Sequence, residues 1–175
     1  LTLGVSLFRS IIQKAYRSFL NDNFLNQMHR EQIGLIAWPY MVLYLVFFIQ
    51  LGSFIYLSGL EKGWFEDASH WQNLGLVIAA MAGLIVLKHI ALIVVGSLYP
   101  LEKETGQYSF SMVIFGIIAG LALTPFNLLL AYGPESIRPV LVISGLAVLL
   151  LIYLYRSIRG VLIGGRFIAQ YQFHF

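Results

Sequence analysis

Four apolar runs, each long enough to cross a lipid bilayer, most strongly limit what this chain can fold into. They cover about residues 35–60, 74–98, 109–131 and 139–155, and the fourth spanning helix, 139–157, is expected to extend slightly beyond its run. A helix needs about 20 mostly apolar residues to cross the ~30 Å hydrocarbon core, because each residue adds about 1.5 Å. The runs are apolar on every side of a helical wheel, as contact with lipid requires. The sequence therefore predicts an all-α, polytopic transmembrane helix bundle with four spanning helices.

The overall composition indicates the same class. The chain is 59% hydrophobic and 11% charged, whereas an average soluble domain has about 45–50% apolar and about 25% charged residues. The sequence contains no cysteine, which excludes a disulfide framework and a thiolate metal site within it. We divide the chain into a cytoplasmic juxtamembrane segment at 1–32 and a transmembrane helical domain at 33–175.

The basic residues predict an orientation. Eight of the eleven Lys and Arg residues fall before the first run, between the second and third, or after the fourth; two fall in the other loops, and Lys88 lies within the second run. Because cytoplasmic loops carry an excess of Lys and Arg, we predict that 1–32, 99–108 and the C-terminal tail are cytoplasmic. In the first outward loop, Trp64 and Trp71 are expected to anchor the bundle at headgroup depth. Docking of an extramembrane partner is the alternative for these two residues.

The segment 8–20 has the pattern of an amphipathic helix. Its basic residues lie away from a set of apolar residues at helical spacing, which are Ile12, Ala15, Tyr16 and Phe19. Such a helix is suited to lying on anionic cytoplasmic headgroups. Alternatively, the residues before Arg9 end an earlier membrane helix. The chain starts at Leu1 and stops after an aromatic run, so we expect further spans beyond one or both ends.

Lys88 lies near the middle of the second run. A charge at the bilayer centre costs about 2.5–3.5 kcal/mol on insertion scales, so such a residue usually faces protein or a cavity. The four runs contain no acidic residue. The counter-charge is therefore expected from a partner, a lipid or an anion. Structural ion pairing with a partner is the first interpretation of Lys88, and a proton or anion transport site is the alternative.

The helix that carries Lys88 also has a ridge of small residues. Gly75, Ala79 and Gly83 recur every four residues, a spacing that lets membrane helices approach closely. His89 falls on the same side of the wheel as Gly75 and Ala79, so we expect it on a helix–helix seam, hydrogen-bonded across it. Ligation of a haem iron by His89 is the more specific alternative, but it normally needs a second axial ligand. The histidines are scattered singly, so no metal site is predicted.

The third run contains a second packing motif and a proline. Gly116 and Gly120 are expected to pack against another helix. Pro125 predicts a kink, and either Asn127 or Thr124 is a candidate to satisfy the backbone groups that proline frees.

Two arginines follow the fourth run. Arg156 and Arg159 are three residues apart and so share one helical face. They are expected to contact lipid phosphates or the carboxylates of a partner. Simple anchoring on the cytoplasmic side is the alternative.

Several short segments resemble a known family. They are Phe24 to Glu31 (FLNQMHRE), Lys88, Glu104 to Phe110 (ETGQYSF), and Tyr155-Arg156 with Arg159-Gly160 and Gly164. In this order they resemble an inner-membrane family of Bacteroidota-type bacteria that is catalogued as a domain of unknown function (four-two-seven-one). The resemblance implies further spanning helices at both ends. Its genes often neighbour uroporphyrinogen-III synthase, an associational link to tetrapyrrole metabolism, and it supplies no catalytic residues.

Three classes of function follow. The first, which we favour, is a non-catalytic accessory subunit or anchor of a larger complex in the bacterial inner membrane, with membrane lipids and other integral membrane proteins as partners. A hetero-complex is favoured over a homo-oligomer, no nucleic acid is expected, and no cofactor is predicted apart from bound lipids. The second class is a small transporter or channel that uses Lys88. The third is a membrane enzyme or factor in lipid or tetrapyrrole metabolism, which would need clustered His, Asp or Glu residues at one membrane face.

Overall fold

The computed structural model describes residues 2–21, 38–65, 69–98 and 102–172. This part of the chain is helical and contains no strand, which confirms the all-α prediction. The elements, in chain order, are α1 (Thr2–Leu20), α3 (Trp38–Glu61), α4 (His70–Leu98), α5 (Glu102–Tyr132), the 3₁₀ turn η1 (Glu135–Ile137) and α6 (Arg138–Gln172).

Within the described part of the chain, four helices are long and apolar enough to cross a membrane, as predicted. The spans are Pro39–Glu61, His70–Leu98, Thr105–Tyr132 and Glu135–Ile158. Three of the helices are longer than their apolar runs. Helix α4 begins at His70, four residues before its run. Helix α5 begins at Glu102, within the predicted loop 99–108, and α6 continues to Gln172.

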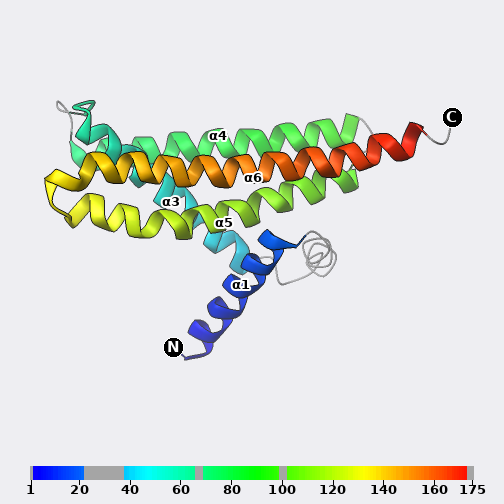
Figure 1. The fold of residues 1–175 in the computed structure, drawn as a ribbon, viewed down its shortest axis with the longest axis horizontal. Coiled ribbons are helices and arrows are strands. Elements are labelled where there is room, and N and C mark those ends of the chain that lie inside the picture. The colour runs from blue at the N-terminus through cyan, green and yellow to red at the C-terminus, as the bar shows by residue number, and fades with distance from the viewer. Residues whose placement is uncertain (1, 22–37, 66–68, 99–101, 173–175) are drawn as a thin grey trace.

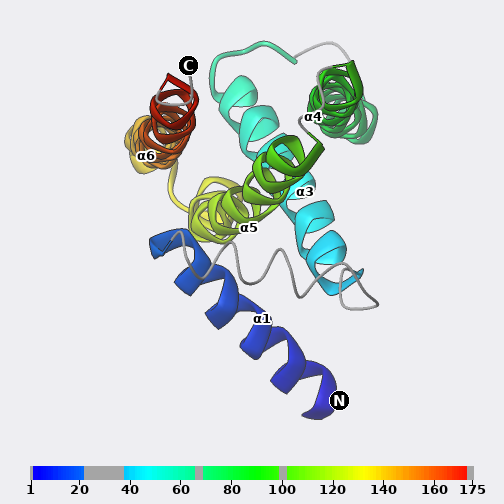
Figure 2. The same cartoon turned by 90° about the vertical axis from the view of Figure 1, so that its right-hand side faces the viewer.

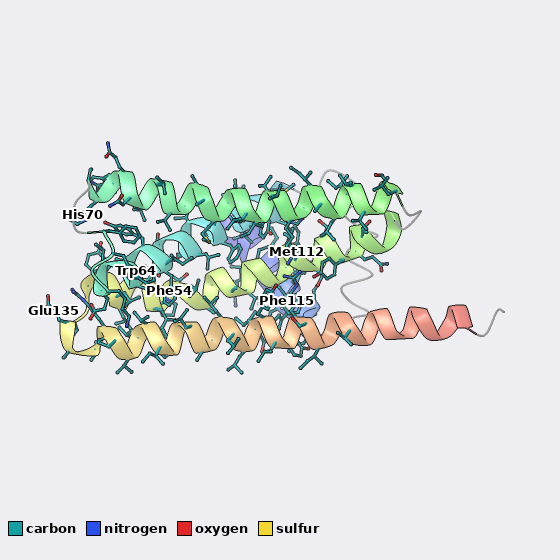
Figure 3. The ribbon with its side chains drawn as sticks, turned by 90° about the horizontal axis from the view of Figure 1, so that it is seen from above. Phe54, Trp64, His70, Met112, Phe115 and Glu135 are labelled. Atoms are coloured by element: carbon teal, nitrogen blue, oxygen red, sulfur yellow. The ribbon has the colours of Figure 1, made fainter. Side chains whose placement is uncertain are left out.

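Helices α3 and α5 form the centre of the bundle, and α4 and α6 flank them. Each flanking helix packs on α5, and α4 also packs closely on α3, but α4 and α6 do not pack directly on each other. Figure 1 shows the long helices side by side, and Figure 2, which looks along the bundle, shows α3 and α5 between the two flanking helices. The loop after α3 and the turn before α6 lie at the same end, near Trp64, His70 and Glu135 (Figure 3).

The core lies mainly between α3 and α5. Its largest fully buried side chains are Phe54, Ile114, Ile117 and Leu123. Gly116 and Gly120 face α3, where Tyr44 and Phe47 pack over them. A Cβ atom added at Gly120 would meet the Cα atom of Phe47 at 3.0 Å, which is closer than ordinary packing allows. The glycines of α5 therefore permit the backbones of the two central helices to approach each other.

Helix α1 packs obliquely on α5 and does not stand free of the bundle (Figure 1). It begins at Thr2, earlier than the predicted start at residue 8. Its buried residues are Ile11, Ala15 and Ser18, whereas Tyr16, which we assigned to the apolar face, is 56% exposed. The remainder of the segment 1–32 after Asn21, including the predicted domain boundary, lies outside the described residues.

We expect the two glycine motifs to respond oppositely to a large side chain. Gly120→Leu should destabilise the bundle by about 2 kcal/mol, since overpacking a close contact typically costs about 1–3 kcal/mol. Gly83→Leu should leave stability nearly unchanged, because nothing lies within 4 Å of a Cβ atom at Gly83. Unfolding of the purified protein in mixed micelles by increasing SDS measures both effects. Equal destabilisation by the two substitutions would contradict this account of the packing.

Candidate functional site

His89 lies on a seam where three helices meet. The Tyr44 hydroxyl of α3 is 3.0 Å from the His89 Nε2 atom, and the Ser109 hydroxyl of α5 is 2.8 Å from the Nδ1 atom. A neutral imidazole donates from one nitrogen and accepts at the other, so the two hydroxyls take complementary roles. The Tyr44 and His89 rings also meet edge to face, with centroids 5.8 Å apart. His89 thus links α4 to both central helices, whereas Gly75 and Ala79, which the helical wheel grouped with it, are exposed.

Two cations from different helices converge beside this seam. The Lys88 Nζ atom of α4 lies 5.9 Å from the centre of the Tyr153 ring of α6. The Arg156 guanidinium of α6 lies 5.8 Å from the same ring and 5.1 Å from the Tyr108 ring of α5. Tyr153 therefore lies within cation–π distance of both charges. Lys88 and Arg156 are also both within electrostatic range of the His89 ring.

We name this group the cationic cluster. Its members come from all four long helices: Tyr44, Lys88, His89, Tyr108, Ser109, Tyr153 and Arg156. Sequence reasoning identified Lys88, His89 and Arg156 as separate candidates and missed the tyrosines and Ser109. The signal available for those four was a hydroxyl within or beside an apolar run, which is common in membrane helices. The Arg159 side chain lies outside the described part of the chain.

The described acidic side chains, Glu61 and Glu135, make no ion pair with the cationic cluster. The ion pair that the described residues do form joins Arg138 to Glu135 at 3.6 Å, at the end of α6 that is far from Arg156. The Nη2 atom of Arg156 is buried and makes no hydrogen bond. A buried charged donor without an acceptor is costly. The cluster is therefore suited to receiving an anion.

The depth of the cluster follows from α5. Ser109 is seven residues after Glu102, where α5 begins, so it lies about 10 Å along the helix at about 1.5 Å per residue. Arg156 lies two residues before Ile158, the end of its span. The cluster is therefore near one boundary of the hydrocarbon core. Lys88, which the run 74–98 placed near the bilayer centre, has its ammonium group among residues of this boundary region.

A second polar contact lies further along the central helices. The side-chain amide of Asn127 in α5 donates to the backbone carbonyl of Gln50 in α3 at 2.8 Å, and also to the Gln50 side-chain oxygen. Asn127 therefore joins α3 to α5 and does not repair the backbone at Pro125 in these contacts. Beside the proline, the Thr124 hydroxyl donates to the Gly120 carbonyl at 3.1 Å.

The small-residue ridge of α4 faces away from the described chain. Gly75, Ala79 and Gly83 are exposed, and nothing lies within 4 Å of a Cβ atom added at either glycine. The ridge makes no helix contact within the described residues, so packing against another molecule stays a prediction. It differs in this from Gly116 and Gly120, which face α3.

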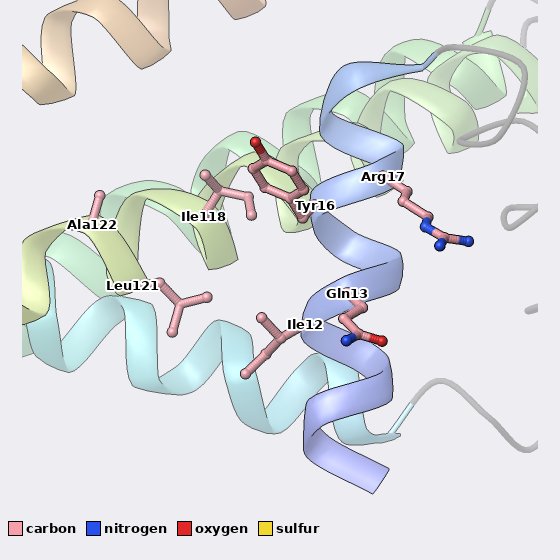
Figure 4. Close-up of a pocket in the computed structure, with 7 residues that line it drawn as sticks. All are labelled: Ile12, Gln13, Tyr16, Arg17, Ile118, Leu121 and Ala122. Atoms are coloured by element: carbon pink, nitrogen blue, oxygen red, sulfur yellow. The ribbon is translucent and has the colours of Figure 1, made fainter. Parts of the chain in front are cut away.

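A groove of about 640 Å³ lies between α1 and α5 (Figure 4). It is lined mainly by apolar side chains, with Gln13 and Arg17 at its edge: Ile12, Gln13, Tyr16, Arg17, Ile118, Leu121 and Ala122. The groove lies outside the cationic cluster. Among the described residues, no group of three or more His, Asp or Glu side chains is placed to hold a metal ion.

Comparison with protein families gives one match. The family described as Domain of unknown function (DUF4271) matches residues 1–175. The chain belongs to this family. No curated protein and no solved structure matches the chain. The DUF4271 assignment confirms the resemblance that the short segments indicated, and it brings no assigned activity to the cationic cluster.

We expect His89 to contribute to the stability of this DUF4271 chain through both hydrogen bonds. His89→Leu should lower the free energy of unfolding by about 1 kcal/mol, the usual scale for hydrogen bonds between membrane helices. Ser109→Ala in the His89→Leu background should then have almost no further effect, because its partner is already gone. SDS unfolding of the two single variants and the double variant measures this coupling. Additive effects would contradict the observed hydrogen bond.

Proposed function

We propose that this protein is a non-catalytic, multi-pass subunit or anchor of a larger complex in a bacterial inner membrane. In this proposal it assembles with other integral membrane proteins along α4. The observation that carries it is the ridge formed by Gly75, Ala79 and Gly83, which is exposed along one side of that helix.

The exposure of α4 supports this proposal. Only 6% of the apolar spanning stretch of α4 is buried inside the described chain, whereas 50% of that of α5 is buried. Small residues at this spacing let a second helix approach closely, and close packing is a main source of association in lipid. At Gly75 and Gly83 the room for such a helix is open. A partner helix with small residues of its own fits this surface best.

The placement of the residues that could act as acids, bases or metal ligands also favours a non-catalytic role. The described part of the chain has no grouped metal ligands. Its described acidic side chains, Glu61 and Glu135, lie in or beside loops at one end of the bundle, away from the cationic cluster. A membrane hydrolase or transferase would need an acid, a base or a metal next to its substrate.

Transport through Lys88 is the second candidate, favoured by the convergence of Lys88 and Arg156. A path through the bundle would have to continue from the cationic cluster to the Asn127–Gln50 contact. The buried side chains between them on α3 are the aromatic rings of Phe47 and Phe48. They pack with Ala119 into an apolar layer that disfavours a polar path. Assembly is therefore the function that the geometry supports better.

Mild extraction of the full-length protein from its native membranes, followed by mass spectrometry, tests the assembly proposal. We expect a stoichiometric membrane partner with the wild-type chain and its loss with Gly83→Leu. The matched control is Ala147→Leu, which places the same side chain at an exposed small residue on α6 and should keep the partner. Self-association without another protein, or equal loss in both variants, would contradict the proposal.

Lys88→Leu separates assembly from transport. If Lys88 serves a transport path, this variant should remain assembled and lose ion flux across reconstituted vesicles. In the assembly proposal the wild-type protein carries no flux of its own, so Lys88→Leu has none to lose. Flux by the wild-type protein alone would contradict assembly as its sole role.

A further inference from the structure

We propose that the cationic cluster binds the phosphate group of an anionic phospholipid from the adjacent leaflet. This is independent of the assembly proposal, because it concerns a different face of α4 and requires no protein partner. The proposal rests on four features of the cluster. They are its charge, a hydrogen-bond donor of Arg156 that lacks an acceptor, the separation of α4 from α6, and the depth of the cluster in the membrane.

The first argument is charge. Lys88 and Arg156 come from different helices and both lie beside Tyr153. Neither Glu61 nor Glu135, the described acidic side chains, pairs with either of them. Two cations near the edge of the hydrocarbon core stabilise an anion more strongly than exposed surface cations do, because the medium around them screens charge less. A phospholipid phosphate is the anion always present at this boundary.

The second argument is the orphaned donor of Arg156. Its Nη2 atom is buried and makes no hydrogen bond within the protein. A guanidinium presents donors in a planar fork that matches two oxygens of one phosphate. The rings of Tyr108 and Tyr153 lie against the same guanidinium and limit its orientations. A phosphate oxygen would supply the acceptor that this group lacks.

The third argument is access. Helices α4 and α6 do not pack directly on each other (Figure 2). The Lys88 Nζ atom of α4 nevertheless lies 5.9 Å from the ring centre of Tyr153 on α6. Apolar side chains next to the cluster are exposed on both helices, including Leu84 and Leu87 on α4 and Leu150 and Leu154 on α6. Acyl chains can lie along these surfaces while the headgroup reaches the cations. A soluble anion has no acyl chains and would make no contact with these apolar surfaces.

The fourth argument is depth. Arg156 is at the end of its span, and Ser109 is about two turns inside α5. Lipid phosphates lie just outside the hydrocarbon core of about 30 Å. The long side chains of Lys88 and Arg156 can extend toward that layer, as lysine and arginine do near helix ends. The site and the phosphate are thus at compatible depths.

Native mass spectrometry of the full-length protein in detergent tests the proposal, with phosphatidylglycerol and phosphatidylethanolamine as probes. We expect phosphatidylglycerol to bind about tenfold more tightly, the effect of one charge-assisted contact. Arg156→Gln and Lys88→Gln should each remove most of this preference. Lys88→Arg should retain it, since it keeps the charge. Arg156→Lys should retain part of it, because it keeps the charge but loses the planar fork of donors. Lys62→Gln, the same change of charge in the loop at the opposite end of the bundle, should leave it intact.

Chemical modification of the wild-type protein gives a second measurement that needs no variant. Phosphatidylglycerol should slow acylation of Lys88 by a membrane-permeant ester severalfold, and phosphatidylethanolamine should not. Equal binding of the two lipids, equal loss with Lys62→Gln, or absence of protection at Lys88 would overturn the proposal. So would protection by millimolar inorganic phosphate alone, which would assign the site to a soluble anion. Cross-linking of Lys88 to an acidic residue of a co-purifying protein would assign it to a partner's carboxylate.

Discussion

The close contact between α3 and α5 is the feature on which the polar centre of this protein depends. Gly116 and Gly120 place the α5 backbone against Tyr44 and Phe47 of α3. Helices in lipid gain little from the hydrophobic effect when they associate, so close packing and hydrogen bonds must hold them together. At this separation one histidine from α4 reaches hydroxyl groups on both central helices. A wider spacing would leave His89 with one partner.

The arrangement of the flanking helices has a separate consequence. Because α4 and α6 pack on the central pair and not on each other, each keeps one face free. Lys88 of α4 and Arg156 of α6 both lie near the ring of Tyr153, which also belongs to α6. Two positive charges are thereby brought together near the membrane boundary without a described acidic neighbour. Such a pair persists where an anion or the aqueous boundary compensates its charge.

Two glycine motifs show how far the sequence could predict packing. The ridge at Gly75, Ala79 and Gly83 and the pair Gly116 and Gly120 have the same spacing, yet only the second packs within the described bundle. The spacing shows that one face of the helix carries side chains small enough for a second helix to approach closely. It does not say which neighbour occupies that face, because this depends on how each helix is rotated in the bundle.

The sequence by itself determined the class of the protein and four helices that are long and apolar enough to span a membrane. Hydropathy and helical period are properties of each segment alone, and the bilayer acts on each segment separately. The tertiary structure decided that Lys88, His89 and Arg156 belong to one cluster, and that Asn127 bonds to Gln50. These groupings join residues far apart in the chain. They are set by the crossing and rotation of packed helices, which no single segment encodes.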